Sequence, residues 1–143
     1  ESNNLKEKLR VLDHISIYYL ITGSYAPVCF ITLNDYSGLP IFFTVLGLSI
    51  LGTIFKIFSV DRYNKLSLIL YLLLGWLIVV DIDTLFSLLD SEAKNLLIAG
   101  GIFYTIGVLF YLLEKIKYNH AIWHIFVLLG SISHYLLILL YVI

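Results

Sequence analysis

The sequence predicts an all-α integral membrane protein whose five transmembrane helices form one domain over residues 1–143. Of its 143 residues, 60% are hydrophobic and only 13% are charged, and the mean hydropathy is +0.95. A soluble domain has about 45–50% apolar and about 25% charged residues. The apolar residues fall in long blocks rather than in an alternating pattern, which is typical of membrane-spanning helices. The net charge of −1 gives no support for nucleic acid as a partner. The long apolar blocks make membrane lipids the expected surroundings.

The first two predicted spans cover residues 11–33 and 40–57. Pro27 lies inside the first span, where it removes a backbone donor and is expected to kink the helix. The single cysteine, Cys29, cannot form an internal disulfide and is expected to act as a small apolar residue. The second span contains glycine and serine at intervals that let membrane helices approach closely. A basic loop that includes Lys56, Arg62 and Lys65 is predicted to follow it.

The remaining three spans cover residues 66–82, 96–113 and 120–143. An acidic segment containing Asp81, Asp83, Asp90 and Glu92 separates the third span from the fourth. We expect the apolar residues among these acids to rest on the membrane surface; they are Leu85, Phe86, Leu88 and Leu89. A short turn at residues 114–119 joins the last two spans. Aromatic residues near the span ends, including Tyr111 and Trp123, fit an interfacial belt.

The basic residues gather on one side of the predicted spans. The N-terminal segment, the loop at residues 56–65 and the turn at residues 114–119 hold eight of the nine basic residues. The flanks on the other side hold Lys94 alone, among five acidic residues. Because cytoplasmic loops are enriched in lysine and arginine, the N-terminus is predicted to be cytoplasmic and the C-terminus to lie outside, with the protein in the plasma (inner) membrane.

Three of the four histidines lie in the fifth span, at His120, His124 and His134. His120 and His124 are four residues apart, so on a helix their imidazoles lie one above the other on the same face. Ionisable side chains at membrane depth are costly and usually face a protein interior or a cavity. Two stacked imidazoles also supply half of a zinc site. The alternative interpretation is a polar pair at the membrane edge, or one that is bonded to a neighbouring helix.

The predicted topology brings Asp13 and His14 to the same depth as the histidine pair. Asp13 can bind a metal directly, orient water on it, or hold a histidine tautomer; alternatively, it simply stabilises the start of its own helix. His14 points about 100° away from Asp13 on a helix, so only one of the two can face the bundle squarely. A catalytic zinc site has three protein ligands and water, so the third ligand must be Asp13, His14 or a residue outside this sequence.

Two residues further along the fifth span are candidates for an outer layer around such a site. Ser131 continues the stripe of His120 and His124, and His134 lies about 15 Å beyond His124 at the rise of an α-helix. His134 lies deeper and is expected to form an interhelical hydrogen bond rather than to bind metal. His14 joins Ser131 and His134 as a possible outer-layer residue.

Several motifs together resemble the hemolysin III proteins, which group with the progestin and adipoQ receptor family and its adiponectin receptors. The resemblance covers nearly the whole chain in the correct order, and its two histidine-bearing motifs together are specific. The segments that carry it are Leu12–Tyr18, Ile21–Pro27, Gly100–Gly107, Phe110-Tyr111 and His120–His124, with Val127 and His134.

This resemblance implies a seven-helix membrane fold with a zinc ion inside the membrane near its cytoplasmic side. It implies that His120 and His124 bind the zinc and that Asp13 contacts it through water. The family's third histidine belongs to a Ser-x-x-x-His motif on its second helix. Because this chain begins just after the place of that motif, its first two family helices and the third ligand are expected to be missing.

The resemblance leaves three functions open. The adiponectin receptors resemble ceramidases, which implies zinc-activated water that cleaves a lipid amide while Asp13 accepts or relays a proton. The second function is a receptor or sensor with structural zinc, and the third is membrane lysis without catalysis. A hydrolase needs an open metal position and a lipid-sized cavity, whereas a structural site is closed. Lysis would not depend on a metal or on His120.

Overall fold

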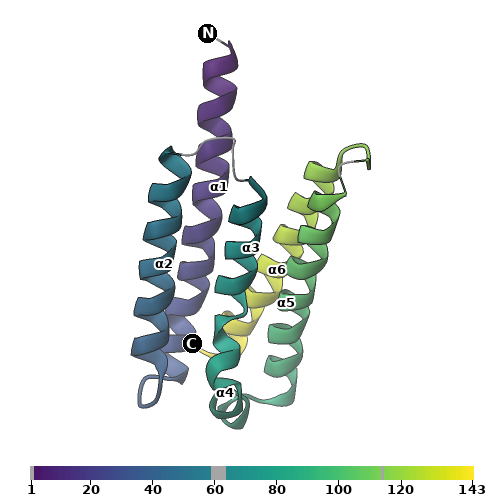
Figure 1. The fold of residues 1–143 in the computed structure, drawn as a ribbon. Helices are drawn as coiled ribbons and strands as arrows, with labels where there is room; N and C mark the ends of the chain where they lie inside the picture. The colour runs from purple at the N-terminus through teal and green to yellow at the C-terminus, as the bar shows by residue number, and fades with distance from the viewer. Residues whose placement is uncertain (1, 59–63, 114) are drawn as a thin grey trace.

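The computed structural model describes residues 2–58, 64–113 and 115–143, and most of these are helical. The helices stand side by side in a bundle, and the two termini lie toward opposite ends of it (Figure 1). Five helical segments are long and apolar enough to cross a membrane, with windows of mean hydropathy between 1.3 and 2.1. The structure thus confirms the predicted all-α membrane class.

The first candidate span, Leu5–Thr32, consists of helix α1 (Ser2–Pro27) and a π-helical turn, η1 (Val28–Thr32). Pro27 does not end the helix; instead the helix widens directly after it. The following turn is closed by the carbonyl of Leu33, which accepts the backbone N–H of Gly38 at 3.0 Å. A Cβ at Gly38 would collide with the backbone carbonyl of Cys29, so this turn requires glycine.

Helix α2 (Gly38–Phe58) packs along α1 through small and hydroxyl-bearing side chains. The ring of Tyr18 lies against Gly52, and the Thr22 hydroxyl donates to the Ser49 hydroxyl at 2.9 Å. Lys56, which was predicted in a loop, lies inside α2 and is only 1% exposed. The rest of the predicted basic loop, including Arg62, falls at residues 59–63 and the side chain of residue 65, outside the described part of the chain.

The third candidate span, Leu66–Leu88, is a broken helix that is longer than the predicted 66–82. It comprises α3 (Asn64–Gly75), a 3₁₀ segment η2 (Leu77–Asp81) and α4 (Ile82–Leu88). The Tyr25 hydroxyl enters the break, donating to the Leu74 carbonyl at 2.8 Å and accepting the Ile78 N–H at 2.9 Å. Those two backbone groups are four residues apart and would bond each other in a continuous α-helix. Tyr25 therefore satisfies backbone groups that lipid could not.

The acidic segment was predicted to place apolar side chains on the membrane surface, and this prediction was wrong for two of them. Leu85 is fully buried and Leu89 is 7% exposed, because the side chains of these two leucines face the protein core. At the same end of the bundle, the Asp81 carboxylate accepts a hydrogen bond from the Ser37 hydroxyl. The acidic residues therefore mark the end of a span that packs against the bundle, rather than a separate surface helix.

Helices α5 (Ser91–Leu112) and α6 (Asn119–Tyr141) form an antiparallel hairpin beside α3 (Figure 1). Glycines let the two helices approach closely: Gly107 faces Trp123 and Phe126, and Gly130 faces the ring of Tyr104. The predicted turn at residues 114–119 joins them, with residue 114 outside the described part. Helix α6 consequently begins at the same end of the bundle as α1, which brings the histidine pair level with Asp13.

Candidate metal centre

Three predicted site residues from two helices meet at the end of the bundle where α1 and α6 begin. The Nε2 atoms of His120 and His124 lie 3.0 Å apart. The Oδ2 atom of Asp13 lies 3.8 Å from Nε2 of His120 and 3.6 Å from Nε2 of His124. In the described residues this is the one group of at least three His, Cys, Asp or Glu side chains whose ligand atoms converge for a metal ion. The structure therefore brings together the three residues that the sequence singled out.

The size of this triangle suits a single metal ion. A point equidistant from its three corners lies about 2.0 Å from each atom, which matches zinc–nitrogen and zinc–oxygen bonds of about 2.0–2.2 Å. Two imidazoles and a carboxylate also form a donor set that suits zinc. The residues present therefore fit a zinc ion held by His120, His124 and Asp13.

The three side chains face an open cavity rather than a closed core. The cavity has a volume of about 550 Å³ and is lined by Leu9, Arg10 and Tyr111 besides the three candidate ligands. The side chains of His120, His124 and Asp13 are 49%, 41% and 31% exposed. A metal bound here would retain a side that is reachable from the cavity.

The turn before α6 fixes the histidines over the end of α5. Tyr118 adopts a left-handed conformation with φ of 64°, which reverses the chain. The Asn119 side chain then accepts the backbone N–H of His120 at 2.8 Å and donates to the Tyr111 carbonyl at 3.0 Å. The start of α6 is thereby tied to the last turn of α5, and this fixes where the first histidine lies.

Aromatic rings pack behind the histidines. Trp123 is 2% exposed, and its ring centroid lies 5.2 Å from that of His120, 4.6 Å from that of His124 and 4.9 Å from that of Tyr111. The prediction that placed Trp123 in an interfacial belt was therefore wrong, because the ring points into the bundle. Its position three residues after His120 and one before His124 is the sequence signal that could have shown this.

His14 and Asp13 point in different directions, as their adjacency in a helix requires. Asp13 faces the histidine pair, whereas His14 is fully buried between α1 and α3 and contacts Tyr71. His14 does not belong to the converging group of ligand atoms. Sequence reasoning did not identify Tyr71, which carries no motif and lies 57 residues from His14 along the chain.

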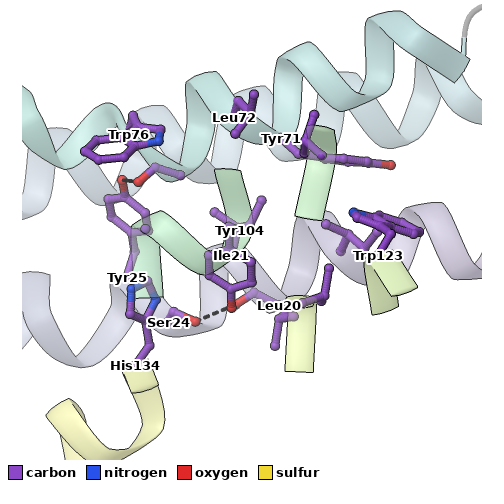
Figure 2. A pocket seen from close by; sticks show the side chains of 15 residues that line it. Leu20, Ile21, Ser24, Tyr25, Tyr71, Leu72, Trp76, Tyr104, Trp123 and His134 are labelled. Carbon is purple, nitrogen blue, oxygen red and sulfur yellow. Dashed lines mark hydrogen bonds between the residues drawn. The ribbon is translucent and has the colours of Figure 1, made fainter. Parts of the chain in front are cut away.

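Ser131 and His134 lie farther along α6. Ser131 shares a 3.0 Å hydrogen bond with the Tyr104 hydroxyl. His134 packs against Gly100 and the ring of Tyr104 and borders a narrow apolar cavity. Tyr71 and Trp123 line the other end of this cavity (Figure 2). Ser131 and His134 therefore lie at the α5–α6 interface and do not contact the three candidate ligands.

Together these features define an integral membrane helical protein with a histidine–carboxylate group that could hold a metal ion. The sequence model of the family described as Haemolysin-III related matches residues 1–135, and the chain belongs to this family.

Comparison with curated proteins supports this assignment. The chain is 47% identical over 137 residues to Hemolysin-3 of Bacillus cereus, a match that covers 95% of this chain and 63% of that protein. It is 40% identical to the Hemolysin-3 homolog of Bacillus subtilis (strain 168), covering 95% of this chain and 64% of the relative. It is 29% identical to the human Monocyte to macrophage differentiation factor, over 91% of this chain and 57% of that protein.

The human protein belongs to the progestin and adipoQ receptor family, which agrees with the wider resemblance in the sequence. The chain spans less than two thirds of the length of these curated relatives. No solved structure matches the chain.

Proposed function

We propose that this protein is a zinc-dependent hydrolase that cleaves amide bonds of membrane lipids. The observation that carries the proposal is the triangle of His120, His124 and Asp13, which has the dimensions of a zinc site and faces an open cavity of about 550 Å³. That volume falls in the range of roughly 300–1,000 Å³ that is typical of small-molecule sites.

In this proposal the imidazoles of His120 and His124 and the Oδ2 atom of Asp13 would hold the ion, and the second carboxylate oxygen of Asp13 would carry protons. A zinc ion bound there supplies positive charge that polarises a carbonyl and lowers the pKa of water. The Asp13 carboxylate accepts the proton of the attacking water, whose oxygen forms the new bond to the amide carbon. It then passes the proton to the departing nitrogen as the C–N bond breaks. The products are a fatty acid and an amine.

The position of the site suggests which part of the lipid it reaches. Asp13 and His120 lie close to one end of their spans, Leu5–Thr32 and Asn119–Tyr141. An amide near the lipid headgroup lies at that depth, whereas acyl chains extend toward the bilayer centre. The apolar residues of the described helices that face outward nearer the bilayer centre, such as Leu20 and Leu128, would contact those chains. Membrane lipids are thus both the surroundings and the proposed substrates.

We further propose that residues outside this chain complete the metal shell. Three ligand atoms that surround a point almost in their own plane leave room for a further ligand on either side. The relatives are longer than this chain, so their additional residues are the proposed source of a third histidine. Zinc bound to the intact gene product but not to this chain alone would agree with this, whereas equal affinity would contradict it.

The same proposal places the metal centre at the cytoplasmic face of the plasma membrane, because the N-terminal segment and the α5–α6 turn are rich in lysine and arginine. We expect a cysteine introduced at Ser2 to be labelled by a membrane-impermeant thiol reagent only after cells are opened, and one at Ile143 in intact cells. Both experiments use a Cys29→Ser background, since Cys29 is the one cysteine of this sequence. The reverse labelling pattern would overturn the orientation.

Asp13→Asn tests the catalytic part of the proposal. We expect it to reduce fatty acid release from a ceramide-type amide by roughly 10²–10⁴-fold, because a general acid–base contributes about that factor. The measurement is fatty acid release by the intact gene product in lipid vesicles, with zinc content determined in parallel. Asp83→Asn, an exposed carboxylate at the opposite end of the bundle, is the matched control.

Release that persists in Asp13→Asn, or in protein stripped of zinc by a chelator, would contradict the hydrolase. Leakage of a vesicle-trapped dye, measured on the same samples, separates the lytic alternative. Leakage that is unaffected by His120→Ala, without amide cleavage, would instead identify a membrane-lytic protein.

A further inference from the structure

A buried pair of side chains, His14 on α1 and Tyr71 on α3, lies beside Asp13, the residue that precedes His14 in the chain. The Tyr71 hydroxyl donates to the backbone carbonyl of His14 at 2.8 Å and lies 3.2 Å from Nδ1 of the same residue. His14 is fully buried and Tyr71 is 6% exposed, so water does not compete for these bonds. One hydroxyl thus contacts both the backbone and the side chain of a single residue of α1.

We propose that His14 and Tyr71 are positioning residues, which hold α1 in the rotation that presents Asp13 to His120 and His124. This inference rests on the metal site of the proposed function. His14 and Asp13 are adjacent and point about 100° apart on the helix, so fixing one direction fixes the other. His14 is held on its two sides, by Tyr71 and by Trp123, with ring centroids 6.2 and 6.3 Å away.

The magnitude of the effect follows from helix geometry. A carboxylate oxygen on the surface of a helix lies about 5–6 Å from the axis, so a rotation of roughly 20° moves it by about 2 Å. That displacement equals a whole metal–ligand bond of about 2.0 Å. Without the contact between His14 and Tyr71, a small rotation of α1 would take Asp13 out of the triangle while leaving the helix in place.

The geometry also assigns the tautomer of His14. The single hydrogen of the Tyr71 hydroxyl is used in the bond to the His14 carbonyl, so the hydroxyl oxygen must accept from Nδ1. A neutral imidazole has one N–H, and here it lies on Nδ1. Nε2 is then a bare acceptor, and it is buried without a hydrogen-bond partner among the described residues. This assignment can be measured without any metal.

Four variants of the intact gene product separate positioning from mere stability. Tyr71→Phe removes only the hydroxyl, and we expect zinc affinity to fall roughly tenfold, in the range of about 10–100-fold seen for groups that orient metal ligands. His14→Gln loses the Nδ1 donor and should behave similarly. His14→Asn places an amide N–H where Nδ1 lies in His14, so its zinc affinity should stay within roughly threefold of the wild-type value. Tyr25→Phe, a buried hydroxyl far from the triangle, should lower stability without changing affinity.

The measurements are competition of zinc with a chelating dye, the absorption spectrum of the cobalt-substituted protein, and ¹⁵N NMR of the His14 imidazole. The proposal predicts an altered cobalt spectrum in Tyr71→Phe but not in Tyr25→Phe, and a proton on Nδ1. Unchanged affinity in Tyr71→Phe, or a proton on Nε2, would overturn the positioning role and leave the metal site standing. Absence of zinc binding by the wild type would overturn both proposals.

Discussion

Replacing His120 or His124 with alanine is expected to weaken zinc binding by at least roughly 100-fold. Groups that merely orient metal ligands contribute about 10–100-fold to affinity, and a ligand itself contributes more. Each variant also removes one corner of a triangle whose imidazole nitrogens lie 3.0 Å apart. The measurement is zinc competition with a chelating dye, using the detergent-solubilised intact gene product.

His134→Ala is the matched control for these variants, because it removes an imidazole from the same helix at the apolar cavity instead. We expect it to retain wild-type affinity. If all three variants bound zinc equally well, the metal would have to be held elsewhere, and the assignment of His120 and His124 would be wrong.

The second large effect is expected at Tyr25. Replacing it with phenylalanine preserves the ring but removes the hydroxyl that joins Leu74 to Ile78 across the break in the third span. A buried polar group left without a partner costs about 1–3 kcal/mol, so we expect a loss of about 2–3 kcal/mol in the free energy of unfolding. Denaturation in mixed detergent micelles measures this loss.

Tyr19→Phe provides the control, because Tyr19 also lies on α1 but is 52% exposed. It should leave the free energy of unfolding nearly unchanged. Equal stability of Tyr25→Phe and wild type would show that the third span closes its own hydrogen bond between Leu74 and Ile78. The hydroxyl of Tyr25 would then not be needed to maintain the break.

The fold class could be predicted because membrane spans are defined by composition and length, which a single sequence contains. The three members of the candidate metal site could also be predicted. The spacing of His120 and His124 places both on one helix face. Three spans lie between the first and the fifth, so α1 and α6 begin at the same end of the bundle. Distances such as the 3.6 Å between Asp13 and His124 could not be predicted, since they depend on packing.

Other features depended on long-range contacts that no local pattern contains. The broken third span is maintained by Tyr25, which lies 53 residues away from Ile78 along the chain. The acids around Leu85 indicated an exposed segment, but the burial of this leucine is decided by its neighbours in space. The role of Trp123 was missed for a related reason: an aromatic residue near a span end fits an interfacial belt equally well.

Metal content is the most direct test of the proposed zinc site formed by His120, His124 and Asp13. Elemental analysis of the intact gene product, purified in detergent without added metal or chelator, gives the ratio of zinc to protein. We expect a ratio close to one zinc per chain, and we expect this zinc to be lost in His120→Ala and His124→Ala. Folded protein that contains no zinc, and that takes up none when zinc is supplied, would show that these three residues do not form a zinc site.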